Sequence, residues 1–333
     1  MRLVQFIDRD GSRRVGVASD DSGEVRVLRQ VQRVYDLALE AGRRKLALAA
    51  LAQDRLGTET VSYDALIAER RLAAPLDHPD PARCLISGTG LSHLGSAAAR
   101  DAMHAKLQQD ESQLTDSMKM FKWGMEGGKP AANTIGVQPE WFYKGDGRCV
   151  VAPEHPMELP AYALDGGEEV EVVGCYVIGD AGEPLRIGFA LGNEYADHVM
   201  ERQNYLYLAH SKLRQCSFGP ELLLGDLPAN VTGQARLLRK GQPVWSDSWL
   251  SGEDNMVHSI ANLEHHHFKY RDFRRPGDVH IHFFGAATGS FTKNVKTYVG
   301  DVFEISASAF GRPLRNALGA AQEEKRFIGV RAL

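Results

Sequence analysis

The 333-residue sequence contains few cysteines, no long apolar run and little excess of charge of either sign. Its cysteines form no CxxC pair and no close cluster, which argues against a disulfide framework and against a thiolate zinc site. They are Cys84, Cys149, Cys175 and Cys216. A reducing compartment that keeps thiols free, the cytoplasm, is therefore the expected location.

No stretch is apolar for the length that a bilayer span requires, and the first residues, MRLVQFIDRDGSRR, carry charges where a signal peptide would be apolar. The 39 basic and 43 acidic residues are interspersed and leave a formal net charge of −4. Such a surface has no electrostatic feature that attracts nucleic acid or an anionic membrane. We expect a soluble protein with neither as a partner.

The length of the chain favours one large domain and a smaller one. Residues 1–78 alternate short β-like runs with Asp-Gly and Ser-Gly turns, contain helical patterns at residues 34–51 and 62–73, and end in a proline-rich stretch. This pattern predicts a small N-terminal α+β domain, with residues 79–333 forming a β-rich second domain. Helices are expected in that domain at 97–124, 196–209 and 255–268.

Glu169 and Glu171 stand two residues apart in a segment with the pattern of a strand. Successive side chains on a strand point to opposite faces, so these two carboxylates point the same way. Carboxylates this close repel each other unless a cation lies between them, and a hard divalent ion with oxygen ligands is the natural choice. Solvated glutamates at an exposed strand start would show the same spacing, and this alternative stays open.

Glu194 and Lys212 are two further candidate site residues. An apolar strand pattern ends at Glu194 and enters a helical pattern. This position lets the carboxylate face a pocket or, as the alternative, interact with the helix dipole. Lys212 lies in a mostly apolar and aromatic neighbourhood, where an ammonium needs an anion or a function. The alternative is a surface lysine whose aliphatic part covers apolar residues.

Three weaker patterns have plainer explanations. The glycines within residues 88–95 have the wrong spacing for a dinucleotide-binding loop. Ser92 and His93 would point apart on a strand, which disfavours a serine nucleophile but lets either side chain line a pocket. The histidine run at 265–267 is expected on a solvated or interface face of a helix rather than around a transition metal.

Taken together, these stretches resemble the fumarylacetoacetate hydrolase superfamily. The shared pattern is an ExE pair opening a strand, a strand ending in Gly-Asn-acid, a lysine before a Phe-Gly-Pro turn, a Pro-x-x-Phe-x-Lys segment and a Pro-Gly-Asp-Val strand entry. It is carried here by Glu169, Glu171, Gly192-Asn193-Glu194, Lys212, Phe218-Gly219-Pro220, Pro139 to Lys144 and Pro276-Gly277-Asp278-Val279. Residues 188–220 are most similar to the branch of 2-keto-3-deoxy-sugar-acid (arabinonate) dehydratases, including a subgroup from arabinose gene clusters.

The resemblance implies an α+β protein with a fumarylacetoacetate-hydrolase-type β-roll that binds Mg²⁺, or Mn²⁺. The implied metal ligands are Glu169, Glu171 and Glu194. Lys212 would bind the carboxylate of a small 2-keto acid substrate or stabilise its enolate, and Glu140 is the acid/base candidate. Further substrate-binding candidates are Ser92, His93, Lys144 and Thr288.

A homodimer is also implied by the resemblance, and the apolar segment at residues 302–305 has the character of a strand buried between subunits. Three departures from the superfamily pattern bear on the reaction. Glu194 replaces the usual aspartate, residues 280–285 replace a threonine-rich substrate loop, and residues 90–95 lack the histidine of the hydrolytic members at its usual place.

A β-elimination needs only enolisation and protonation of the leaving hydroxyl, whereas hydrolysis also needs an activated water. The displaced histidine therefore favours a magnesium-dependent dehydratase in pentose catabolism. Its expected reaction converts a 2-keto-3-deoxy pentonate, such as 2-keto-3-deoxyarabinonate, to 2-ketoglutarate semialdehyde. The alternatives are a C–C bond hydrolase of a 2,4-diketo acid or acylpyruvate, and a catalytically inert sugar-acid-binding protein.

Overall fold

A computed structural model describes residues 1–19, 23–94 and 114–333 of the chain. Its largest element is an 11-stranded sheet in the order β4-β3-β2-β1-β11-β10-β9-β14-β5-β6, with β7 paired to β11 at the side of this path. The strands are β1 (Arg2–Ile7), β2 (Arg13–Ala18), β3 (Glu24–Leu28), β4 (Leu56–Ser62), β5 (Cys84–Gly88), β6 (Phe142–Asp146), β7 (Val150–Val151), β9 (Val170–Ile178), β10 (Pro184–Asn193), β11 (Cys216–Leu223) and β14 (Val279–Phe283).

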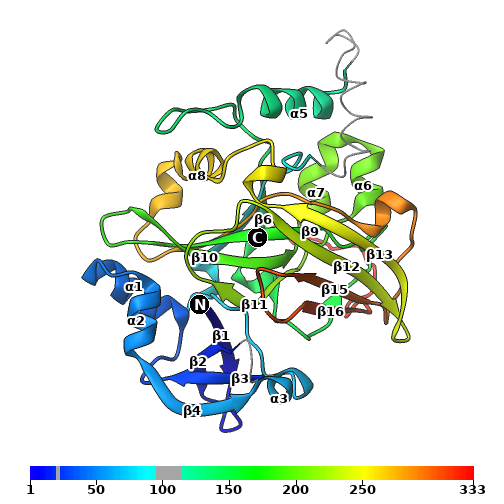
Figure 1. The fold of residues 1–333 in the computed structure, drawn as a ribbon. Helices are drawn as coiled ribbons and strands as arrows, with labels where there is room; N and C mark the ends of the chain where they lie inside the picture. The colour runs from blue at the N-terminus through cyan, green and yellow to red at the C-terminus, as the bar shows by residue number, and fades with distance from the viewer. Residues whose placement is uncertain (20–22, 95–113) are drawn as a thin grey trace.

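A second sheet of five strands packs against the large one and has the order β13-β12-β15-β16-β8. In Figure 1 its longer strands lie on the right, coloured yellow to dark red. The strands are β8 (Met157–Glu158), β12 (Val231–Arg239), β13 (Gln242–Ser251), β15 (Val302–Ala307) and β16 (Leu314–Gly319). Side chains from β9 and β10 meet side chains from β12, β15 and β16 in one hydrophobic cluster between the sheets.

The helices of the described ranges are short and lie around the sheets. They are α1 (Val34–Arg44), α2 (Leu48–Asp54), α3 (Tyr63–Ala68), α5 (Asp116–Gly127), α6 (His198–Gln203), α7 (Leu208–Lys212) and α8 (Ile260–Phe268). No helix in these ranges is long and apolar enough to cross a membrane. The first part of the helix expected at 97–124 falls outside the described residues, and α5 forms its last part.

The N-terminal segment, blue in Figure 1, has the predicted α+β content, and its sheet continues into the rest of the molecule. Strand β1 pairs antiparallel with β11, with Leu3 opposite Leu222. Helix α1 packs over the large sheet, and Val34 and Leu37 share a hydrophobic cluster with Val177 of β9. The two predicted domains are thus joined by backbone hydrogen bonds as well as by a shared core.

Two sequence-based expectations about elements are wrong. The helix expected at 34–51 breaks after Arg44, where Lys45 adopts a left-handed conformation with φ 53° and closes the last turn of α1. The histidine run lies in α8, but only His265 is exposed, because His266 and His267 are buried. Strand β15 is paired on both sides within its own chain, and Phe303 and Ile305 belong to the core, so this strand adds no support to the homodimer, which stays a prediction.

Candidate active site

The three predicted metal ligands lie on adjoining segments because β9 and β10 are antiparallel neighbours. Asn193 at the end of β10 pairs with Val170 at the start of β9, so Glu194 and Glu169 are adjacent. The Glu194 amide donates a 3.1 Å hydrogen bond to the Glu169 carbonyl. Glu171 and Glu194 are almost completely buried. Their burial excludes solvated glutamates as the explanation of the pattern.

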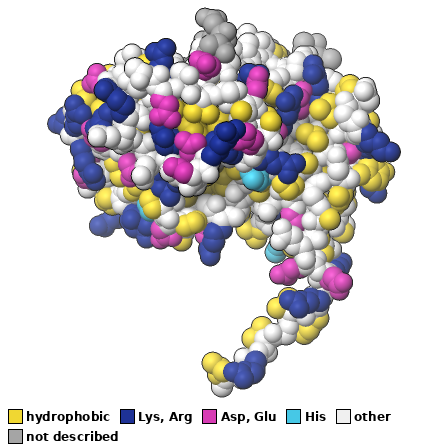
Figure 2. All heavy atoms as spheres, turned by 90° about the horizontal axis from the view of Figure 1, so that it is seen from below, with side chains coloured by type: hydrophobic (Ala, Val, Ile, Leu, Met, Phe, Trp, Pro, Cys, Tyr) yellow, Lys and Arg dark blue, Asp and Glu magenta, His cyan; other side chains and the backbone are white. Residues whose placement is uncertain are grey.

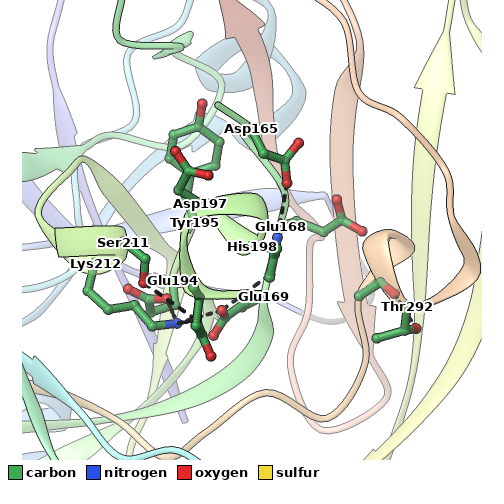
Figure 3. A network of polar contacts seen from close by, with 12 residues as sticks. Asp165, Glu168, Glu169, Glu194, Tyr195, Asp197, His198, Ser211, Lys212 and Thr292 are labelled. Carbon is green, nitrogen blue, oxygen red and sulfur yellow. Dashed lines mark hydrogen bonds and ion pairs between the residues drawn. The ribbon is translucent and has the colours of Figure 1, made fainter. Parts of the chain in front are cut away.

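Lys212 of α7 reaches into this carboxylate group, as Figure 3 shows. Its Nζ lies 2.5 Å from Glu169 Oε1 and 2.9 Å from Glu194 Oε2, with Glu201 Oε2 at 3.9 Å. The lysine side chain is itself 4% exposed. Lys212 is therefore a buried cation that faces several acids, not a surface residue.

The electrostatics of the group show how tightly the charges are coupled. Burial acts to raise the pKa of Glu169, but Lys212 and His198 outweigh it and hold that pKa well below the usual range. Burial, followed by the charges of Glu169 and Glu194, raises the pKa of Glu171 well above its usual value. Burial lowers the pKa of Lys212, but Glu169 and Glu194 overcome this and raise it well above normal.

The donor set fits a hard divalent cation. The buried Glu171 and Glu194 neighbour the partly buried Glu169, and Glu171 keeps one buried oxygen, Oε1, that has no hydrogen-bond partner. Unpaired buried carboxylate oxygens are costly, and Mg²⁺ or Mn²⁺ prefers such ligands. In the present arrangement Lys212 supplies the countercharge, and within the described ranges no three acidic, histidine or cysteine side chains converge on one point as ion ligands.

His198 is a site residue that the sequence patterns did not single out. It begins α6, four residues after Glu194, and it stacks on Phe291 with ring centroids 4.7 Å apart. Its Nδ1 lies 3.3 Å from Asp165 Oδ2 and its Nε2 lies 3.3 Å from Glu169 Oε1. Burial lowers the pKa of His198, but these two carboxylates outweigh it and raise the pKa to about 9. His198 is thus a second cation beside Glu169 (Figure 3).

A cavity of about 470 Å³ opens beside this group and contains most of the predicted site residues. Its lining includes Ser92, His93, Glu140, Glu169, Lys212 and Thr288, together with His198, Glu168 and Glu201, which were not predicted. Apolar side chains, among them Phe121, Phe142 and Phe291, complete the wall. A polar end and an apolar wall in one cavity suit a small, partly polar ligand.

Glu140 faces this cavity and accepts a 2.6 Å hydrogen bond from the Tyr205 hydroxyl. Burial raises its pKa, although Tyr205 and Lys212 oppose the shift. A carboxyl group with a raised pKa can take up a proton and release it again within a reaction cycle. The position therefore suits the acid/base role predicted for Glu140.

Ser92 and His93 do not point apart as expected, because residue 91 has a positive φ and this segment is not a strand. Ser92 Oγ lies 3.0 Å from His93 Nδ1 and donates a short hydrogen bond to the Phe284 carbonyl. His93 Nε2 lies 2.9 Å from Ser251 Oγ. Burial lowers the pKa of His93 to about 4, so the ring is neutral and both its nitrogens are already engaged.

Of the two remaining substrate-binding candidates, Thr288 lines the cavity and Lys144 does not. Lys144 is fully buried and does not line this cavity. Its ammonium donates to Glu194 Oε1 at 2.5 Å and to the carbonyls of Tyr195 and Lys212. Thr288 lines the cavity while its hydroxyl donates to Asp247 at 2.9 Å. Lys144 therefore supports Glu194 from behind, and Thr288 forms part of the wall.

No family model matches this sequence, and no curated protein matches it by sequence. Among solved structures, the fold is similar to that of 2-keto-3-deoxy-D-arabinonate dehydratase, with a TM-score of 0.68 and 18% identity over 97% of this chain and 100% of that one. The values are the same for that enzyme complexed with magnesium and 2,5-dioxopentanoate. A 5-carboxymethyl-2-hydroxymuconate delta-isomerase from Mycobacterium smegmatis is also similar, with a TM-score of 0.55 and 16% identity over 96% and 100% of the two chains.

These likenesses extend over nearly the whole chain and confirm the predicted fold, that of the fumarylacetoacetate hydrolase type. The fold is the property shared between this chain and both a dehydratase and an isomerase. Because one fold can carry several reactions, the choice between them rests on the site.

Proposed function

We propose that this protein is a divalent-metal-dependent dehydratase of the fumarylacetoacetate hydrolase superfamily that acts on a 2-keto-3-deoxy sugar acid. The observation that carries the proposal is the buried group of Glu169, Glu171, Glu194 and Lys212 at the end of one cavity. The similarity in fold to an arabinonate dehydratase supports the choice of substrate class. Four free cysteines support a reducing, cytoplasmic location.

The chemistry needs a 2-keto acid held with its keto oxygen towards the carboxylates. A divalent cation bound by Glu169, Glu171 and Glu194 would polarise that oxygen and acidify the protons on C3. Lys212 lies where it can pair with the substrate carboxylate. Glu140 would take a proton from C3 and return one to the hydroxyl that leaves C4 as water.

The charges of the cavity support a substrate with a single carboxylate. Among the described residues that line it, the cations are Lys212 and His198, and both already face Glu169. Four glutamates line the same space, namely Glu140, Glu168, Glu169 and Glu201. A second substrate carboxylate would meet further acids there, so a sugar acid suits this cavity better than a dicarboxylic acid.

Dehydration is also favoured over C–C hydrolysis by the histidines. His93 is neutral and has both ring nitrogens engaged, and His282 lies in a separate buried cluster rather than at this cavity. His198 faces a carboxylate with each nitrogen. In the described part of the site, no histidine has a free nitrogen positioned to activate a water molecule.

The test is product analysis with both enantiomers of 2-keto-3-deoxy pentonate, using protein stripped with a chelator and reloaded with Mg²⁺ or Mn²⁺. We expect metal-dependent loss of one water with all five carbons retained. Lys212→Met, checked for folding by circular dichroism, is the control that should abolish turnover. Release of pyruvate, or turnover of acylpyruvates alone, would place the protein among the C–C-cleaving enzymes. Sugar-acid binding without any turnover would identify an inert binding protein.

A further inference from the structure

Tyr205 connects the acid/base candidate Glu140 to a part of the chain that lies 65 residues further on. Its phenol hydroxyl donates a 2.6 Å hydrogen bond to Glu140 Oε2, and both side chains line the cavity. Tyr205 opens a short 3-10 turn, η4 (Tyr205–Tyr207), which lies between α6 and α7. The Asn204 side chain caps this turn by accepting a 3.0 Å hydrogen bond from the Leu206 amide. The cap fixes the backbone from which the phenol reaches Glu140.

The contacts of Glu140 distinguish its two carboxylate oxygens. Oε2 accepts the hydrogen bond from Tyr205, whereas Oε1 accepts none from the residues that the structure describes. A Cβ on Gly90 would stand 2.0 Å from Oε1, so the carboxylate can lie there only because residue 90 is a glycine. Gly90 lines the same cavity. The carboxylate is therefore held between Tyr205 and Gly90, with Oε1 as the oxygen that can exchange a proton with a ligand.

The Tyr205 hydroxyl also acts on the charge of Glu140. Burial raises the pKa of this carboxyl group, and the hydrogen bond from Tyr205 is the largest influence that lowers it, ahead of the positive charge of Lys212 in α7. The charges of Glu201 in α6 and of Glu169, which precedes β9, raise the pKa. A hydrogen bond to the ionised form favours that form, so Tyr205 helps to keep Glu140 a base in surroundings that otherwise favour its protonation.

We propose that Tyr205 is a positioning residue that acts through Glu140, a role that rests on the proposed function. In that reaction Glu140 takes a proton from C3 and returns one to the hydroxyl that leaves C4 as water. Because Tyr205 holds Oε2, the same oxygen, Oε1, receives the proton and returns it, and the carboxylate need not turn between the two steps. Tyr205 keeps its own proton throughout, because burial and the hydrogen bond to Glu140 both raise the pKa of its phenol.

The first test needs no turnover, so its outcome does not depend on the proposed function. The infrared band of the protonated Glu140 carboxyl group is identified by its loss in Glu140→Gln and is followed through a pH titration. In Tyr205→Phe the band should persist to a pH about one unit higher, because the ionised form has lost a hydrogen bond. The matched control is Tyr207→Phe, which removes a phenol hydroxyl from the same turn and should titrate as the wild type does. An identical titration in wild-type protein and Tyr205→Phe would overturn the proposal.

The second test measures turnover of the keto acid as a function of pH. In Tyr205→Phe the acidic limb of kcat/KM should move up by about one pH unit and kcat should fall roughly 10-fold, with KM unchanged. In a Glu140→Gln background the same substitution should have no further effect, because the two residues act as a unit.

Two results of the second test would contradict the positioning role. A raised KM with an unmoved acidic limb would make Tyr205 a contact of the substrate instead, and additive losses in the double variant would show that it acts independently of Glu140. Wild-type protein that turns over no keto acid would refute the proposed function, whereas the infrared titration would still decide whether Tyr205 controls the protonation of Glu140.

Discussion

At the scale of single residues, Glu171 has the least favourable surroundings in the site. One of its carboxylate oxygens accepts a 2.7 Å hydrogen bond from the Gly285 amide, and the other has no partner. Its neighbours Glu169 and Glu194 both oppose its ionisation. Glu171→Gln removes this repulsion and one metal ligand, so metal-free protein should gain stability on the order of 1 kcal/mol.

The same variant should lose the stabilisation that Mg²⁺ gives to the wild-type protein, because a ligand stabilises only the state that binds it. Thermal unfolding with and without Mg²⁺ measures both effects. Glu168→Gln is the matched control, since Glu168 points to Ser290, whose amide and hydroxyl both donate to it. A Glu171→Gln protein that still gains stability from Mg²⁺ to the wild-type extent would place the metal elsewhere.

Gly285 lets its backbone lie close to Ser92 and Thr89, and from there its amide donates a hydrogen bond to the Glu171 carboxylate. It has φ +105°, and a Cβ there would lie 2.0 Å from Ser92 Oγ and 3.0 Å from the Thr89 carbonyl. We expect Gly285→Ala to lower the free energy of unfolding by more than about 1 kcal/mol and to weaken Mg²⁺ binding.

Chemical denaturation and a metal titration measure the two effects of Gly285→Ala. The control is Gly300→Ala, because Gly300 has φ +95° but no atom within 4 Å of its added Cβ. It carries the same backbone strain without the collision. Equal losses of stability in the two variants would contradict the role given to Ser92 and Thr89.

The sequence predicted part of this site, for identifiable reasons. Glu169 and Glu171 follow from strand periodicity, and Lys212 from an ammonium in apolar surroundings. His198 was missed because its place in the site depends on a contact with Asp165, which lies 33 residues earlier. Contacts between residues so far apart leave no local pattern in the sequence. The burial of Lys144 behind Glu194 is likewise a product of strand pairing and has no signature in residue spacing.

At the scale of elements, strands were easier to predict than helix ends. Strand β3 is one of the β-like runs expected within residues 1–78, because its alternation is regular. Strand β4 was missed, since its sequence LGTETVS is polar and mostly exposed at the edge of the sheet. The end of α1 depends on the left-handed backbone conformation of Lys45, which cannot be predicted from a lysine in the sequence.

Helix α8 and strand β14 share a buried histidine cluster, formed by His267, His280 and His282. His267 Nε2 lies 2.9 Å from His280 Nδ1, and His282 Nδ1 lies 2.9 Å from Ser87 Oγ. Burial lowers the pKa of His280 to about 4, opposed by the charge of Asp278, and burial together with His280 lowers the pKa of His282 to about 3. The folded protein thus keeps these rings neutral.

This cluster should make the fold sensitive to acid. Histidines in an unfolded chain are protonated below about pH 6.5, whereas these histidines stay neutral in the folded state. Because the unfolded state then binds more protons than the folded state, the free energy of unfolding falls as the pH falls. At about pH 5, His280 and His282 should each subtract about 2 kcal/mol from the free energy of unfolding. Urea unfolding at a series of pH values measures the slope, and His282→Gln should flatten it. A midpoint independent of pH between neutrality and about pH 5 would contradict the prediction.

At the scale of the whole molecule, the continuous large sheet was not foreseen. The expected β-like runs of the N-terminal segment include β1, but Phe218-Gly219-Pro220 was expected to form a turn and lies instead within β11, with which β1 pairs across more than 200 residues. The pairing lets α1 cover β9, the strand that begins between Glu169 and Glu171. The N-terminal segment is therefore part of the scaffold under the site, although it contributes none of the described residues that line the cavity.

A homodimer is still predicted, but the reason is now the exposed apolar surface of the molecule and not strand β15. Residues 327–333 stand away from the body as an extended segment (Figure 2), with Phe327, Ile328, Val330 and Leu333 largely exposed. A cavity of about 420 Å³ is lined by Tyr162, Met200, Gln203, Tyr207, His210 and Leu213, and Tyr162 also lines a hollow that Ile328 borders. Burying each large apolar side chain contributes roughly 1.5–3 kcal/mol, which offsets part or all of the entropic cost of association when a second copy covers this segment.

We therefore expect light scattering at micromolar concentration to give the mass of a dimer. Removal of residues 327–333 should shift the protein towards monomer, because the lost contacts are those of the extended segment. The variant Lys325→Ala changes a residue just before this segment without removing apolar area and should leave the dimer intact. A monomer mass for the full chain would refute the dimer. A dimer that survives the truncation would instead place the subunit contact on another face of the molecule.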